Sequence, residues 1–163
     1  MVTIVCHKIS IKVNSEITAS EEIFFWFKQL NNPPIPDKVM WWQCETLLHE
    51  GFANIVEHAH KDLPPHTPIA LEAERCEKYI EICIWFYGPI FNLEQKLKEI
   101  PPLEDNESEG GRGLRIMDEL ADWLIYDSIG DNLNCLRMKK YFHKKETGDI
   151  LEQGKPREQK EAE

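Results

Sequence analysis

The sequence predicts an α/β (α+β) fold: a two-layer sandwich in which a mostly antiparallel mixed sheet carries helices on one face. The first observation is the order of its segments: strand, helix, helix, strand, strand, a loop-rich stretch, helix, strand, strand. The second is a long amphipathic helix with a carboxylate and an amide one turn apart on its polar side. The third is a glycine-rich turn that leads straight into a later helix. We expect one domain over residues 1–142 and a charged, disordered tail over residues 143–163.

The N-terminal segments predict a strand and then a helix. Residues 2–13 are rich in β-branched side chains, although their alternation is imperfect around Cys6 and His7. Residues 15–30 carry apolar side chains at helical spacing, and the Asn-Asn-Pro-Pro run at 31–34 ends this helix.

A longer helix is predicted from Asp37 to about Lys61. Its buried stripe recurs every three or four residues, at Met40, Cys44, Leu48, Phe52, Ile55 and Ala59. The same spacing on the other side gives a polar row, formed by Glu50, Asn54, Glu57 and Lys61. A carboxylate in such a row can accept a proton, and an amide oxygen can ligate a hard cation. The alternative is a solvated polar face, which is the usual meaning of such a row.

The middle of the chain predicts two strands and a connection. Residues 69–74 form a short strand, and residues 79–87 alternate isoleucines on one face. Residues 92–109 contain Pro101-Pro102 and a run of acids, which predicts a short helix with a loop or a mobile lid.

The last folded segments predict a helix over 113–121 and a hairpin. Its strands, 123–128 and 133–142, are joined around Gly130-Asp131-Asn132. A sheet with helices on one side leaves its other face to solvent or a partner, which allows a homodimer.

The glycine-rich turn reads Glu109-Gly110-Gly111-Arg112-Gly113-Leu114. Glycines just before a helix let backbone N–H groups approach an anion, and the helix N-terminus adds partial positive charge. A phosphate group is the ligand that such a turn most commonly binds. Most isolated glycine-rich turns, however, are only helix starts.

The composition narrows the classes of partner. A net charge of −10 argues against binding to nucleic acid or to an anionic membrane. No apolar run approaches membrane-spanning length, and the N-terminus lacks the apolar core of a signal peptide, so we expect a cytoplasmic protein. The five cysteines are scattered without a C-x-x-C pair, which indicates reduced, mostly buried thiols.

The two motifs together resemble a known family. The Glu50-x-x-x-Asn54 pair, followed by Glu57-His58-Ala59, is similar to the N box of the GHKL (Bergerat-fold) ATPases, and most closely to that of bacterial anti-sigma-factor serine kinases. The run Gly110-Gly111-Arg112-Gly113-Leu114 resembles a glycine box of the same family. The resemblance covers about residues 3–141 in the same order of elements.

The resemblance implies a role for each matching residue. Asn54 would hold the Mg²⁺ that bridges ATP phosphates, and Glu50 would act as base toward a substrate serine. The phosphates would lie against the glycine box, in which Arg112, or Arg115 one turn later, adds positive charge. From its angular position, we expect His58 to be a packed, hydrogen-bonded structural histidine.

The sequence departs from the family at one box. There, an aspartate followed by two glycines accepts a hydrogen bond from the adenine amino group. Here Gly88 and Pro89 match, but Phe86 stands at the aspartate position and Ile90 at the second glycine. A phenylalanine cannot accept that bond, and losing it costs roughly 1.5–3 kcal/mol, or about ten- to a hundredfold in affinity.

Two functions follow from the resemblance. The first is an anti-sigma-factor-like serine kinase that binds ATP and Mg²⁺, phosphorylates an anti-sigma-factor antagonist and sequesters a sigma factor. The second is a regulatory binding module of the same fold with little or no bound nucleotide. Glu50 and Asn54 favour the first, and Phe86 favours the second.

Overall fold

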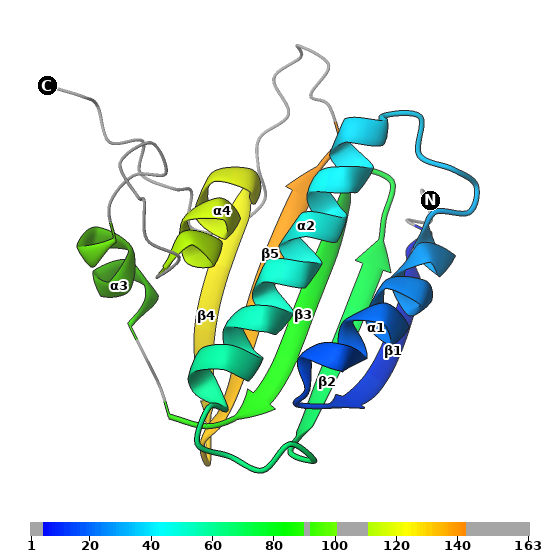
Figure 1. The fold of residues 1–163 in the computed structure, drawn as a ribbon. Helices are drawn as coiled ribbons and strands as arrows, with labels where there is room; N and C mark the ends of the chain where they lie inside the picture. The colour runs from blue at the N-terminus through cyan, green and yellow to red at the C-terminus, as the bar shows by residue number, and fades with distance from the viewer. Residues whose placement is uncertain (1–4, 90–91, 101–110, 143–163) are drawn as a thin grey trace, which may run out of the picture.

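A computed structural model describes residues 5–89, 92–100 and 111–142 of the chain. The expected tail, half of the expected lid (residues 101–109) and Gly110 lie outside these residues. Each described element follows a segment that the sequence predicts, as Figure 1 shows. The strands are β1 (His7–Asn14), β2 (Pro68–Arg75), β3 (Tyr79–Tyr87), β4 (Trp123–Gly130) and β5 (Leu133–Tyr141). The helices are η1 (Ile17–Ala19), α1 (Ser20–Phe27), η2 (Lys28–Leu30), α2 (Lys38–Asn54), η3 (Ile55–Ala59), α3 (Leu93–Glu99) and α4 (Arg112–Leu120).

The strands form one sheet in the order β1-β2-β3-β5-β4. Every pairing described is antiparallel, so the described sheet is more regular than the mixed sheet expected. Strands β4 and β5 form the predicted hairpin, and Asp131 and Asn132 adopt positive φ angles of 51° and 61° at its turn. Two such residues match the right-handed twist of the flanking strands, which explains a short turn here.

Helices α1, α2 and α4 cover one face of the sheet (Figure 1). Alternate strand residues therefore face the helices and form the core, among them Ile69, Leu71, Ile82, Ile84 and Leu136. Phe52 from α2 and Phe27 from α1 fill the space between the layers and are fully buried. This arrangement confirms the predicted two-layer class. No helix of the described residues is long and apolar enough to cross a membrane.

The long helix begins as predicted but ends differently. The Asp37 side chain caps α2 by accepting a hydrogen bond from the Met40 backbone N–H at 3.0 Å. After Asn54 the chain continues as the π-helical turn η3 rather than as regular α-helix. Such a turn inserts an extra residue, so the angular positions beyond Asn54 no longer follow the spacing of 3.6.

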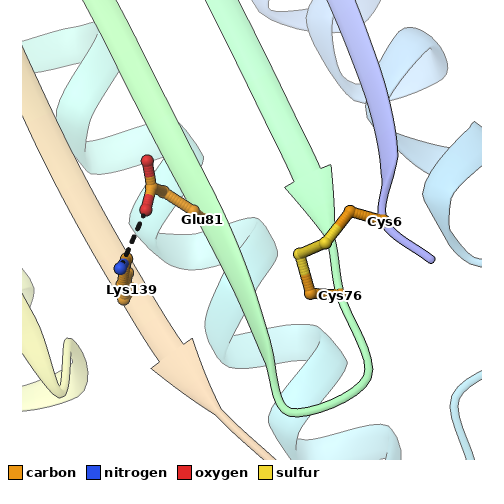
Figure 2. The surroundings of a disulfide bond; sticks show 4 residues. All are labelled: Cys6, Cys76, Glu81 and Lys139. Carbon is orange, nitrogen blue, oxygen red and sulfur yellow. Dashed lines mark ion pairs between the residues drawn. A yellow bond between two sulfur atoms is a disulfide. The ribbon is translucent and has the colours of Figure 1, made fainter. Parts of the chain in front are cut away.

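The opposite face of the sheet carries ion pairs between strands. The Glu81 carboxylate forms ion pairs with Arg137 at 3.0 Å and with Lys139 at 3.2 Å. Lys8 forms an ion pair with Glu72 at 3.4 Å. Figure 2 shows the Glu81–Lys139 pair. These contacts hold β5 to β3 and β1 to β2 on the side that no described helix covers.

The expectation of five reduced thiols is wrong at two positions. Cys6 and Cys76 form a disulfide between the start of β1 and the end of β2 (Figure 2). Sequence spacing could not reveal this pair, because the two cysteines are 70 positions apart and meet only through the pairing of β1 with β2. Cys44, Cys83 and Cys135 are buried free thiols, as expected.

Candidate functional site: a cleft between helices α2 and α4

A cleft of about 600 Å³ lies between the C-terminal half of the long helix and the start of α4. Six residues singled out in the sequence line it: Glu50, Asn54, Gly111, Arg112, Gly113 and Leu114. The cleft thus brings the two motifs together, although some fifty residues separate them in the chain. Its described lining comes from helices α2, η3 and α4 and from the residue before α4, and includes no strand residue.

The start of α4 faces this cleft. Gly111 is the N-cap residue and has a φ of +78°, a conformation that favours glycine. The first N–H groups of a helix have no partner within the helix and carry partial positive charge. Ile100 packs against Gly111. A Cβ atom added at Gly111 would lie only 2.6 Å from the Cδ1 atom of Ile100. The turn is therefore shaped both by its backbone and by its contact with the segment after α3.

Glu50 approaches the first turn of α4 closely. A Cβ atom at Gly113 would lie only 2.5 Å from Glu50 Oε2, so a larger residue there would displace the carboxylate. The missing side chain allows a carboxylate of α2 and backbone groups of α4 to lie at the same end of the cleft. This is the arrangement that a base beside a bound phosphate requires.

Asn54 is the last residue of α2, and only 7% of its surface is exposed. It lies one turn after Glu50 and lines the cleft beside it. An amide oxygen and a carboxylate oxygen at this spacing are suitable ligands for Mg²⁺, which prefers hard oxygen donors. The residues present therefore fit a divalent cation at this end of the cleft.

Five further lining residues were not assigned to the site from the sequence: His49, Ala53, Glu57, His58 and Ile116. The prediction that His58 is a packed structural histidine is wrong, because it is exposed and lines the cleft. His58 follows Asn54 by four positions, which places it beside the polar row, and it lies on the π-helical turn η3. Glu57 belongs to the predicted polar row of the long helix, so the sequence contained a signal that could have placed it in the site.

The structural histidine is His60, which is only 3% exposed. Its Nε2 lies 2.6 Å from the Tyr87 carbonyl oxygen and its Nδ1 lies 2.9 Å from Ser15 Oγ. A carbonyl can only accept, so Nε2 donates to it, and in the neutral ring Nδ1 accepts from the Ser15 hydroxyl. His60 thus connects the end of η3 to the ends of β1 and β3.

Phe86 is buried beside His60. It is 1% exposed and makes edge-to-face contacts with His60 at 5.8 Å and with Tyr126 at 5.6 Å, measured between ring centroids. It does not line the cleft. Gly88, also expected in the site, lies outside the lining as well, where its N–H donates to the Asn132 carbonyl at 3.0 Å. Phe86 itself therefore offers no acceptor in place of the missing aspartate.

The two arginines of α4 have different surroundings. Arg112 is exposed and lines the cleft. Arg115 instead donates from Nη2 to the Leu97 and Ile100 carbonyls, at 2.7 and 2.6 Å. Arg112 is thus the only Arg or Lys among the described lining residues, which also include the carboxylates of Glu50 and Glu57. A phosphate in this cleft would need a divalent cation to offset the two carboxylates.

Comparison with known proteins agrees with this geometry. Residues 15–140 match the family model described as a histidine kinase-like ATPase domain. No curated protein matches the chain. The match spans most of the chain and includes Glu50, Asn54 and the described part of the glycine-rich turn. The chain therefore belongs to the histidine kinase-like ATPase family, the ATP-binding domains of the GHKL type.

Proposed function

We propose that this protein is an anti-sigma-factor-like regulatory serine kinase that binds Mg–ATP through the phosphate end of the cleft. The observation that supports it is the meeting of Glu50, Asn54 and the first turn of α4 around one cleft. A bound Mg²⁺ would neutralise charge on the transferred phosphoryl group. Asn54 supplies a hard amide oxygen of the kind that such an ion needs.

Other residues of the chain would accept the serine proton and stabilise the phosphate charge. The Glu50 carboxylate can accept the proton of a serine hydroxyl as that oxygen attacks the phosphoryl group. The N–H groups at the start of α4 and the Arg112 guanidinium can stabilise charge on the phosphate oxygens. The partners we propose are an anti-sigma-factor antagonist, which would carry the serine, and a sigma factor, which the domain would sequester. The net charge of −10 favours regulation in the cytoplasm through protein contacts rather than direct binding to nucleic acid or a membrane.

Phe86 favours a second candidate, a binding module of the same fold that regulates with little or no nucleotide. Its ring is packed between His60 and Tyr126 and gives adenine no hydrogen-bond acceptor. ATP would then be held by its phosphates alone. Its binding would be weaker by the free energy of the missing hydrogen bond to the adenine amino group.

Calorimetric titration with ATP, with and without Mg²⁺, separates the two candidates. For the kinase we expect Mg²⁺-dependent binding that Asn54→Ala abolishes, while Glu45→Ala, on the same helix but outside the cleft lining, leaves it unchanged. We also expect Glu50→Gln to retain binding but to lose phosphoryl transfer to a serine. Absence of Mg–ATP binding in the wild-type protein would reject the kinase and favour the second candidate.

A further inference from the structure

Three side chains of metal-ligand type meet at the edge of the sheet formed by β1 and β2. They are Cys6, Cys76 and Glu74, and their ligand atoms all lie within 4.8 Å of one another. Among the described residues this is the one group of three His, Cys, Asp or Glu side chains that meets this criterion. It lies on the opposite face of the sheet from α2 and α4, and so is separate from the cleft.

The backbone by itself places these residues together. The register of β1 with β2 pairs His7 with Arg75, so the next pair along is Cys6 with Cys76. Their Cα atoms are 4.3 Å apart, close to the ~4.5 Å of a non-hydrogen-bonded antiparallel pair. Glu74 precedes Cys76 by two positions and therefore projects from the same face. The cluster thus follows from strand pairing, whether the two sulfur atoms are bonded or not.

We propose that Cys6, Cys76 and Glu74 bind a thiophilic divalent cation such as Zn²⁺ when the disulfide is reduced, and that the disulfide excludes this cation. A dithiol reductant supplies two electrons and two protons, which convert the disulfide into two thiols while the dithiol becomes a cyclic disulfide. The cation then replaces the two thiol protons, which pass to solvent. Two thiolates and one carboxylate fill three positions of a tetrahedral site, and water can fill the fourth.

The surroundings leave Glu74 available for this role. Its neighbour Glu72 projects from the same face but is paired with Lys8 at 3.4 Å. Glu74 is the cross-strand partner of Lys8 and interacts with it electrostatically, but among the described residues the ion pair of Lys8 is with Glu72. Glu72 and Glu74 are both glutamates on the same face of β2. Of the two, only Glu74 has a carboxylate oxygen within 4.8 Å of both sulfur atoms.

The remaining thiols are poorer metal ligands. Burial raises the pKa of Cys44 to about 12, so this thiol keeps its proton at neutral pH. The pKa of Cys83 is also raised, by its hydrogen bond with Cys135, by burial and by Glu81. Cys6 lies at the start of the edge strand and is partly exposed, so a cation can reach it.

The test uses Co²⁺ as a spectroscopic probe, because thiolate ligation gives it intense charge-transfer absorption. The full-length protein is reduced with dithiothreitol, freed of it by gel filtration under argon, and titrated with Co²⁺ and then with competing Zn²⁺. We expect one Co²⁺ with thiolate bands per reduced chain, no thiolate bands in the oxidised chain, and a Zn²⁺-dependent rise in the melting temperature of the reduced chain.

Four variants identify the ligands. Cys76→Ser should lose the thiolate bands, and Glu74→Gln should weaken binding by about tenfold or more. Glu72→Gln and the double variant Cys83→Ser/Cys135→Ser should bind as the wild type does. The proposal is overturned if the reduced chain, folded or unfolded, develops no Co²⁺–thiolate bands. Bands that survive in Cys76→Ser, or equal effects of Glu72→Gln and Glu74→Gln, overturn it as well.

Discussion

At Gly113 the absence of a side chain determines how closely α4 approaches the Glu50 carboxylate. We expect Gly113→Ala to weaken binding of Mg–ATP, because its methyl group would lie 2.5 Å from Glu50 Oε2 and would push the carboxylate aside. The carboxylate is the end of a flexible side chain, and alanine is a better helix former than glycine, so we expect the free energy of unfolding to change by no more than about 1 kcal/mol. Urea denaturation measures the change in stability.

A double-mutant cycle identifies the cause. In a Glu50→Ala background the carboxylate is gone, so Gly113→Ala should affect stability more favourably than in the wild type. An equal effect in both backgrounds would show that the methyl group collides with something other than Glu50.

Phe86 provides a second prediction at the scale of single residues. Phe86→Asp should destabilise the fold by at least about 3 kcal/mol, because it removes a buried ring and places a carboxylate among His60 and Tyr126. Phe86→Leu retains an apolar side chain and should cost only about 1 kcal/mol. If urea denaturation gave the two variants the same stability, the ring would not be packed as described.

At the scale of elements, Arg115 connects α4 to the end of α3. The Leu97 and Ile100 carbonyls that it binds lie where a helix leaves its C=O groups without partners. We expect Arg115→Ala to accelerate hydrogen–deuterium exchange of residues 93–100, measured by mass spectrometry, because these carbonyls lose their donor. Arg112→Ala, one turn earlier on the same helix, should leave that exchange unchanged; similar acceleration in both variants would count against the connection.

Strands β3 and β5 are joined through Glu81, which gives a pH dependence. Burial alone would raise the pKa of Glu81, but hydrogen bonds from Arg137, Cys83 and Lys139 outweigh it and lower that pKa below the ordinary 4.5. The folded state therefore favours the ionised form. This stabilisation is complete above the unfolded pKa and is lost as the pH falls through the lower folded pKa.

Urea denaturation from pH 7 down to pH 3 tests this. The wild-type protein should lose more stability over this range than Glu81→Gln, which cannot titrate. Glu72→Gln removes only an exposed pair with Lys8 and should behave as the wild type does. A wild-type profile parallel to that of Glu81→Gln would show that Glu81 has the same pKa in both states.

At the scale of the whole molecule, the sequence predicts the layers well because their signals are local and periodic. The apolar stripe from Met40 to Phe52 predicts which face of α2 is buried, and the isoleucines predict which face of β3 is buried. In the structure these two faces pack against each other in the core. The pairing of Asn54 with the glycine-rich turn came from a resemblance of motifs, and the structure places both at one cleft.

The features that sequence reasoning missed depend on contacts between distant segments or on a break in periodicity. The disulfide needs the register of β1 with β2, and the role of Arg115 needs the position of α3 beside α4. The π-helical turn η3, on which His58 is exposed, and the burial of His60 directly after it were not predicted. No regular spacing in the sequence contains that information.

We propose that the cleft binds phosphate groups, while Phe86 gives adenine no hydrogen-bond acceptor. Calorimetric titration of the wild-type protein with Mg–ATP and with Mg–tripolyphosphate tests this most directly. We predict that both bind, with dissociation constants within about tenfold of each other, or roughly 1.4 kcal/mol, because adenine adds little. Mg–ATP that bound more than about a hundredfold more tightly than Mg–tripolyphosphate would contradict the claim, since the base would then contribute most of the specificity.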